Sequence, residues 1–208
     1  MSGKKYKTEQ EKFWVQDYAE AYRKNNKKFD TAGGIEAWDK MLRRASDISN
    51  ILECGSNTGR NIESLNSILP DAKKSIIEIS PEAFEIVSDN YEIEDSYNGS
   101  IISSEFDESN FDLVFTMCVL IHIHPDDLLE NMKKLFDYSR KYILIGEYFN
   151  RTPVMIEYHG QKERLFKRDF GRMFIENFDV KLLDYGFQWG WLYDNAGFDD
   201  VTWWLFKK

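Results

Sequence analysis

The sequence predicts an α/β fold, in which a doubly wound, mostly parallel sheet of seven strands ends in an antiparallel C-terminal hairpin. Three observations support this prediction. Residues 51–61 have the pattern of a strand, a turn with two glycines and the start of a helix. Up to residue 148, apolar runs alternate with segments of helical spacing, as in βαβ units. The end of the chain holds two strand-like runs with no helical pattern between them.

The individual elements follow from the hydrophobic periodicity. Two helices are expected ahead of the sheet, within 13–22 and over 34–45. Five strands are expected over 48–53, 74–79, 98–102, 111–117 and 141–148. The helices between them are expected over 60–68, from Pro81 onward and over 126–139. A helix over 170–177 and strands over 180–187 and 201–207 complete the fold, after a segment at 149–170 that is too long for a mere connection.

Composition limits the kind of partner. The chain has 208 residues, 42% of them hydrophobic, which fits one domain with a sizeable core. Its net charge is −9 and acidic residues interleave with the basic ones, so we expect no nucleic-acid partner and no membrane surface. No apolar run approaches the ~20 residues of a membrane span and the start is too polar for a signal peptide, so a cytoplasmic protein is expected.

The cysteines and histidines do not form a metal motif. Cys54 and Cys118 lie in apolar, strand-like contexts and are expected to be buried, reduced thiols. The three histidines stand at no usual zinc spacing from them, so no metal is expected. Among the tryptophans near the end of the chain, Trp203 is expected in the core; for Trp189, Trp191 and Trp204 core and surface stay open.

The turn after the first strand suits a ligand. Gly55 and Gly59 let the backbone approach a bound molecule, and the N–H groups at the helix start favour an anion or a carboxylate. The middle glycine of a dinucleotide fingerprint is absent, however, and an ordinary strand-to-helix turn would explain both glycines equally simply.

On these residues the chain resembles the class I S-adenosylmethionine-dependent methyltransferases. The pattern Glu53-x-Gly55-x-Asn57-x-Gly59 matches their first loop with Asn57 in place of the middle glycine, a mild change because Asn tolerates left-handed backbone. Glu78 falls 23 residues after Gly55, near the spacing of a carboxylate that receives ribose hydroxyls. Residues 111–123 match the family's fourth strand, F-D-x-V, and the loop after it.

A narrower resemblance is to the methylases associated with pseudaminic acid biosynthesis. It covers most of the chain and is carried by residues 119–126, 142–150, 152–154, 164–170, 185–187 and 200–203, and more loosely by 18–22. The resemblance implies one Rossmann-like domain over 1–208, with a helical cap or lid (1–46), a cofactor-binding core (47–150) and an acceptor-side segment with the hairpin (151–208).

S-adenosylmethionine is the cofactor that the resemblance implies. Glu78 would hold the ribose hydroxyls and Gly55, Ser56 and Asn57 would lie near the methionyl part. The residues expected to contact the cofactor are Tyr22, Asn26, Glu53, Gly55, Ser56, Asn57, Gly59, Glu78, Ile79, Ser100, Ile101, Thr116, Met117 and Cys118. Simpler roles stay open: a solvated charge for Glu78, helix packing for Tyr22 and turn formation for Asn26.

Methyl transfer requires an aligned acceptor and, for an oxygen or nitrogen acceptor, loss of a proton. His122 is the first candidate base, because it follows the cofactor-facing loop and the intrinsic pKa of a histidine side chain suits a base; a structural role is equally open. His124, before Pro125, is expected to be a turn or helix-cap residue. Tyr148 and Asn150, at the end of the fifth strand, are expected to position the acceptor.

A basic and aromatic cluster follows the fifth strand. It fits an anionic acceptor, such as a sugar acid or a sugar nucleotide, and a solvated basic loop fits equally well. The expected acceptor-binding residues are Glu147, His159, Arg164, Lys167 and Arg168, with a structural hydrogen bond as the alternative for Glu147.

These expectations predict an enzyme that methylates a small polar molecule, such as a sugar or sugar nucleotide in surface-glycan biosynthesis. Two alternatives stay open: an NAD-type oxidoreductase, and a nonenzymatic protein that binds a cofactor or partner on the same scaffold. Either a monomer or a homodimer fits the sequence.

Overall fold

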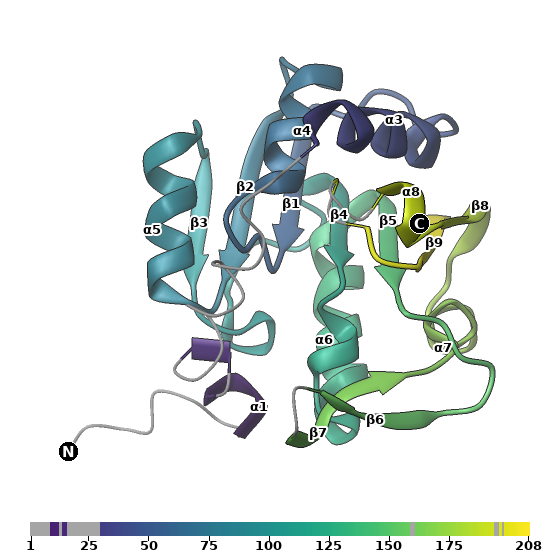
Figure 1. Ribbon diagram of the computed structural model, residues 1–208. Helices are drawn as coiled ribbons and strands as arrows, with labels where there is room; N and C mark the ends of the chain where they lie inside the picture. Colours follow the sequence, from purple (N-terminus) through teal and green to yellow (C-terminus); the bar gives the residue numbers. More distant parts are fainter. Residues whose placement is uncertain (1–8, 13, 16–29, 159–160, 194–195, 197) are drawn as a thin grey trace.

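A seven-stranded sheet in the order β3-β2-β1-β4-β5-β9-β8 runs through the computed structural model, which describes residues 9–12, 14–15, 30–158, 161–193, 196 and 198–208 (Figure 1). The strands are β1 (Asn50–Cys54), β2 (Lys73–Glu78), β3 (Asp95–Asn98), β4 (Phe111–Met117), β5 (Ser139–Glu147), β8 (Lys181–Gln188) and β9 (Val201–Lys207). The strands β3, β2, β1, β4 and β5 are parallel to one another, and β9 is antiparallel to both of its neighbours, β5 and β8. The predicted fold class is therefore confirmed.

Helices pack on both faces of the sheet (Figure 1). They are α1 (Glu9–Lys12), α3 (Thr31–Leu42), α4 (Arg60–Ile68), α5 (Pro81–Asn90), α6 (Pro125–Tyr138), α7 (Phe170–Asn177) and α8 (Gly190–Tyr193), with 3₁₀ turns η2 (Ile101–Ser103) and η3 (Leu120–His122). A proline in the first turn and a side-chain cap fix the N-termini of α5 and α6. Ser80 accepts a hydrogen bond from the N–H of Ala83 in α5, and His124 accepts one from the N–H of Asp126 in α6. The predicted cap role of His124 is confirmed.

The two large apolar clusters of the core lie on opposite faces of the sheet, because side chains alternate along a strand, and a smaller third cluster holds Ile62, Ile76 and Val87. Leu113 and Phe115 of β4 pack with Trp38 of α3, whereas Val114 between them packs with Leu128 and other residues of α6. Trp203 is buried as predicted, and Trp204 is buried too. Trp189 and Trp191 lie 51% and 78% exposed and stack on each other. Cys54 and Cys118 are both free thiols, as predicted, but only Cys54 is buried, whereas Cys118 is partly exposed.

The structure corrects one prediction about local structure and adds two strands where none was predicted. The strand expected over 98–102 lies earlier, over Asp95–Asn98, because the chain turns at Gly99 and the 3₁₀ turn η2 carries Ile101 into the core. The segment at 149–170, too long for a mere connection, contains a hairpin of β6 (Val154–Tyr158) and β7 (Gln161–Lys167), for which no strands were predicted. The hairpin is held because β7 packs against η3, with Phe166 edge-on to the ring of His124.

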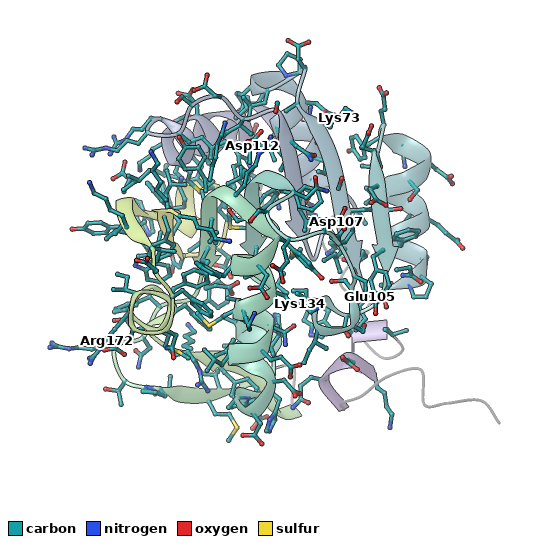
Figure 2. The ribbon with its side chains drawn as sticks, turned by 180° about the vertical axis from the view of Figure 1, so that it is seen from behind. Lys73, Glu105, Asp107, Asp112, Lys134 and Arg172 are labelled. Carbon is teal, nitrogen blue, oxygen red and sulfur yellow. The ribbon has the colours of Figure 1, made fainter. Side chains whose placement is uncertain are left out.

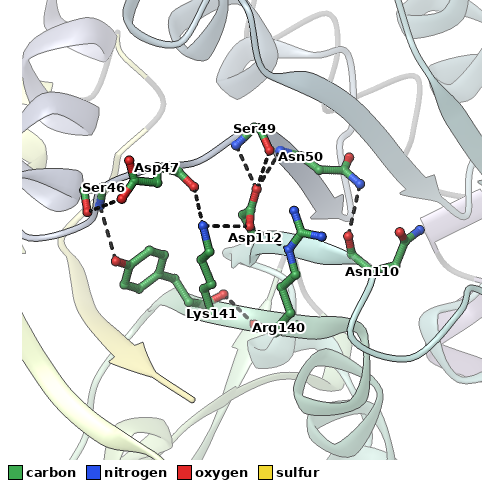
Figure 3. A network of polar contacts seen from close by, with 10 residues as sticks. Ser46, Asp47, Ser49, Asn50, Asn110, Asp112, Arg140 and Lys141 are labelled. Carbon is green, nitrogen blue, oxygen red and sulfur yellow. Dashed lines mark hydrogen bonds and ion pairs between the residues drawn. The ribbon is translucent and has the colours of Figure 1, made fainter.

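A buried carboxylate joins three strands at the end of the sheet away from the glycine turn (Figure 3). Asp112 of β4 is 0% exposed and accepts from Ser49 and Asn50 at the start of β1, and from Arg140 of β5 at 2.7 Å. Lys141 lies 3.2 Å away. Burial opposes ionisation, but these donors outweigh it and hold the pKa of Asp112 well below its usual value.

Within the described residues, no helix combines the length and apolar character that a membrane crossing requires. The same part of the chain contains no group of three potential metal ligands from His, Cys, Asp or Glu.

Candidate cofactor and acceptor site

The glycine turn lies at the carboxyl end of β1, where it contacts the loop that follows β4. Gly55 has φ +90°, and a Cβ there would come within 2.4 Å of Val119 Cγ2. Only glycine therefore allows both this backbone conformation and this contact. Strand order reverses between β1 and β4, the place where sheets of this type bind ligands.

Asn57 occupies the left-handed region with φ 47°, between Gly55 and Gly59. The sequence-based view that Asn suits this position is thus supported by the backbone. We predict that Asn57→Gly changes the free energy of unfolding by no more than ~0.5 kcal/mol, whereas Asn57→Val costs about 1–2 kcal/mol. Urea unfolding measures both. Thr58→Val, at a position outside the left-handed region, is the control; an equal loss there would contradict the conformational argument.

Glu78 ends β2 and is almost fully buried. Its Oε2 accepts from the N–H of Asn57 and its Oε1 from the N–H of Ser80, each at 2.7 Å. Burial raises its pKa, and these backbone bonds oppose the rise. Because each carboxylate oxygen can accept two hydrogen bonds, the contacts that hold the glycine turn leave acceptor capacity for a ligand's hydroxyls.

Glu53 ends β1 with a carboxylate that is 0% exposed. Its Oε1 accepts from Asn61 Nδ2 at 2.7 Å, while its Oε2 has no hydrogen-bond partner. The hydroxyl of Ser56, in the turn that follows, is also buried without a partner. Burial raises the pKa of Glu53 to about 8, because few groups stabilise its charge. Both atoms are therefore available to form a hydrogen bond with a ligand.

Glu147, at the end of β5, holds the loop after β4. One oxygen accepts from Thr116 Oγ1 and from the N–H groups of Val119 and Leu120, and the other from the N–H of Ile121, at 2.9–3.2 Å. The side chain is 0% exposed. These contacts fit the structural alternative for Glu147; acceptor binding by this residue stays a prediction.

The loop after β4 starts with strained backbone. Thr116 is fully buried, and Met117 packs so tightly that a Cβ on Gly146 would lie 2.3 Å from its sulfur. Cys118 has φ 57°, and its N–H donates to the carbonyl of Gly146. Burial raises the pKa of the Cys118 thiol well above its usual value, so it is not a reactive thiolate.

Three residues that are expected to contact the cofactor follow β2 and β3. Ile79 follows β2, and Ser100 caps η2, whose Ile101 is buried. The loop after η2 is fixed from α6: the Nζ of Lys134 and the hydroxyl of Tyr138 both donate to the carbonyl of Ser104, at 2.8 and 2.7 Å. Figure 2 shows Lys134 beside this loop.

Each of the three expected catalytic residues has contacts of its own. His122 ends η3, and its ring lies 4.4 Å from that of Trp14. The hydroxyl of Tyr148 donates to Asp199 at 3.0 Å, and Lys167 lies over the Tyr148 ring. Asn150 Nδ2 donates to the carbonyl of Thr152, so its side chain shapes the connection into the hairpin.

Arg168 follows the hairpin and forms a single bridge with Phe149, two residues after the end of β5. Its Nε is buried without a hydrogen-bond partner, and its guanidinium lies over the ring of Phe166. Desolvation lowers its pKa. Other predicted site residues cannot be placed: Tyr22, Asn26 and His159 lie outside the described residues, as does the side chain of Arg164.

Sequence reasoning missed three contributors to this site: Asn61, Val119 and Asp199. Asn61 carries a signal in retrospect, because it lies on the first turn of the helix after the glycine turn. Val119 and Asp199 carry none, since their contacts with Gly55 and Tyr148 depend on the packing of distant segments.

Comparison with known proteins identifies the central part of the chain. Residues 51–141 match the family described as methyltransferase domain. They include the glycine turn, Glu78 and the loop after β4. A comparison with curated proteins found no match.

Solved structures share the fold over nearly the whole chain. An S-adenosylmethionine-dependent methyltransferase from Leishmania major has a TM-score of 0.74 at 16% identity, covering 100% of this chain and 87% of that one. The 1,6-didemethyltoxoflavin N1-methyltransferase of Burkholderia thailandensis has a TM-score of 0.70 at 12% identity, covering 95% and 86%. The magnesium protoporphyrin IX methyltransferase of Synechocystis has a TM-score of 0.68 at 9% identity, covering 99% and 100%. At these identities the likeness establishes the fold.

Residues 51–141 are thus a methyltransferase domain. The fold around this domain is shared with solved S-adenosylmethionine-dependent methyltransferases.

Proposed function

We propose that this enzyme transfers the methyl group of S-adenosylmethionine to a small, anionic, polar acceptor, and that the acceptor lies between η3, the end of β5 and β7. The observation that carries the proposal is the buried, unpartnered Nε of Arg168 beside the end of β5. A nucleotide-linked sugar of surface-glycan biosynthesis is the acceptor that the sequence resemblance implies. The cytoplasmic location and the division of the chain into cap, core and acceptor-side segment remain predictions from the sequence.

The residues at the ends of β1 and β2 fit the cofactor. The free Oε2 of Glu53 and the hydroxyl of Ser56 would receive the ammonium group of its methionine part, and Glu78 its ribose hydroxyls. The close contact between Gly55 and Val119 leaves backbone, not side chains, to face the cofactor. The cofactor supplies a methyl group on a sulfonium, and the chain's residues bind, align and exclude water around it.

His122 is proposed as the base that takes the acceptor's proton. We expect His122→Ala to lower kcat about 10²–10⁴-fold without changing the affinity for S-adenosylhomocysteine. His124→Ala is the matched control, because His124 caps α6 and its loss should cost stability but not kcat. An unchanged kcat in His122→Ala would favour a mechanism without this base.

Arg168 is proposed to pair with the acceptor's negative charge. We expect Arg168→Gln to raise KM for an anionic acceptor roughly 10–100-fold, the effect of losing one hydrogen bond to a charged group. Arg172→Gln is the control, since Arg172 is exposed and bonded to Glu176 within α7. A methyl-donor assay across nucleotide-linked sugars and their uncharged analogues provides the measurement. Equal use of charged and uncharged acceptors would refute the anionic class.

The rival functions predict different ligands. An NAD-type oxidoreductase would bind a dinucleotide, and a nonenzymatic binding protein would bind S-adenosylmethionine without turning it over. The φ of Asn57 favours the methyltransferase over the first rival, because a left-handed Asn replaces the glycine that lets backbone approach a pyrophosphate.

A further inference from the structure

A chain of hydrogen bonds leads from α3 through α4 to the buried carboxylate of Glu53. The indole Nε1 of Trp38 donates to Asn61 Oδ1 at 3.2 Å, and Asn61 Nδ2 donates to Glu53 Oε1 at 2.7 Å. Trp38 and Glu53 are both 0% exposed. The chain thus links the helix ahead of the sheet to the residue that ends β1.

The indole determines which way the amide of Asn61 faces. An indole can only donate, so the amide oxygen must face Trp38 and the amide NH₂ must face Glu53. Trp38 itself has little freedom, since its ring packs edge-on to Phe115 at 4.7 Å, and Phe115 is the neighbour of Glu53 in the sheet register. The orientation of Asn61 is therefore imposed by packing.

This arrangement occupies one oxygen of Glu53 and leaves the other vacant. The neighbours of Glu53 in the sheet, Ile76 and Phe115, are apolar. The described groups that interact with its charge are neutral or acidic: Asn61 of α4, Glu78 of β2, Tyr91 after α5 and Cys54 of its own strand. Glu63 of α4 accepts from Tyr91 and Thr31. In such surroundings the ionised form of the carboxylate is unfavourable unless a ligand supplies a cation, and without one the group is neutral.

We propose that Trp38 and Asn61 are positioning residues, which turn the free oxygen of Glu53 toward the cofactor's ammonium group and couple cofactor binding to release of one proton. This proposal rests on the proposed use of S-adenosylmethionine by the same site.

The proton comes from Glu53. With its pKa raised to about 8 by burial, Glu53 is mostly protonated at pH 7 in the cofactor-free protein. The ammonium group pairs with the ionised carboxylate, so the carboxyl proton passes to the buffer when the ligand binds. The affinity should therefore rise about tenfold per pH unit below the pKa and level off above it. The bond from Asn61 lowers this pKa, so its removal should shift the whole profile to higher pH.

Calorimetry with S-adenosylhomocysteine between about pH 6 and 8.5, in two buffers of different ionisation enthalpy, tests the proposal. We expect release of close to one proton at pH 7 in the wild type. In Asn61→Ala and Trp38→Phe we expect a profile displaced upward by at least half a pH unit, about a threefold loss of affinity at pH 7. The control ligand is 5′-methylthioadenosine, which lacks the ammonium group and should bind with no dependence on pH.

Thr31→Val is the control variant. It removes another hydrogen bond between α3 and α4, from Thr31 to Glu63 at 2.7 Å, that does not reach Glu53. Its affinity for S-adenosylhomocysteine should depend on pH as in the wild type. A shift equal to that of Asn61→Ala would mean that any loosening of α3 against α4 has the same effect, and it would overturn the proposal. A profile without pH dependence in the wild type would overturn it as well. Absence of any S-adenosylhomocysteine binding would instead reject the proposed function, and this inference with it.

Discussion

Replacing Asp112 by Ala should destabilise the protein by about 3–5 kcal/mol, the cost of breaking a buried ion pair from one side. The carboxylate satisfies the backbone N–H groups of Ser49 and Asn50 and pairs with Arg140, and it is fully buried (Figure 3). Its loss would leave these donors without an acceptor where β1, β4 and β5 meet. Urea unfolding at pH 7 measures the effect.

The pH dependence identifies the charge as the cause. Because the folded pKa of Asp112 lies below the unfolded value of about 3.9, its contribution is complete above that pH and is lost as the pH falls through the folded pKa. The difference in stability between wild type and Asp112→Asn should therefore shrink below about pH 4. Asp126→Asn is the control, since that side chain is 88% exposed. A constant difference across the acid range would contradict this assignment.

Replacing Glu147 by Ala should cost roughly 3–6 kcal/mol, because at least three backbone N–H groups of residues 119–121 lose their acceptor in a buried place. Affinity for S-adenosylhomocysteine should fall too, since Val119 packs directly against Gly55. Unfolding and calorimetry at pH 8 measure the two effects.

Thr116→Val provides the matched comparison for Glu147. It removes only the hydroxyl donor to the same carboxylate, 3.2 Å away, and should cost no more than about 1 kcal/mol. If Glu147 contacts the acceptor rather than the loop, Glu147→Ala would instead raise KM for the acceptor and leave stability and cofactor affinity near the wild-type values.

Local signals were strong enough to predict most of the fold from sequence. Helices over 60–68 and 170–177 and the strand over 111–117 have the predicted bounds, because their apolar residues recur at a clear period. The β6–β7 hairpin escaped prediction because its stability depends on β7 packing against η3, a contact distant in sequence. The third strand was predicted too late in the sequence, because the apolar Ile101 was assigned to a strand. In the structure Ile101 is buried from a 3₁₀ turn instead.

The site was less predictable than the fold. The glycine pattern around Gly55 and the spacing from Gly55 to Glu78 predicted where β1 and β2 end, because the end of a strand depends on short-range backbone geometry. The partners of each carboxylate could not be inferred, because they come from other elements: Asn61 for Glu53 and the loop after β4 for Glu147. From sequence alone Glu53, Glu78 and Glu147 are three similar carboxylates at strand ends. Their hydrogen bonds distinguish Glu53, which has an oxygen without a partner, from Glu78 and Glu147, which hold loops.

Calorimetry with S-adenosylmethionine, S-adenosylhomocysteine and NAD shows which cofactor the site binds. We expect binding of the first two at about one molecule per chain, with no heat from NAD, because the site offers a carboxylate for an ammonium group and lacks the glycine for a pyrophosphate. Absence of heat with both S-adenosyl compounds, or binding of NAD in their place, would contradict this expectation.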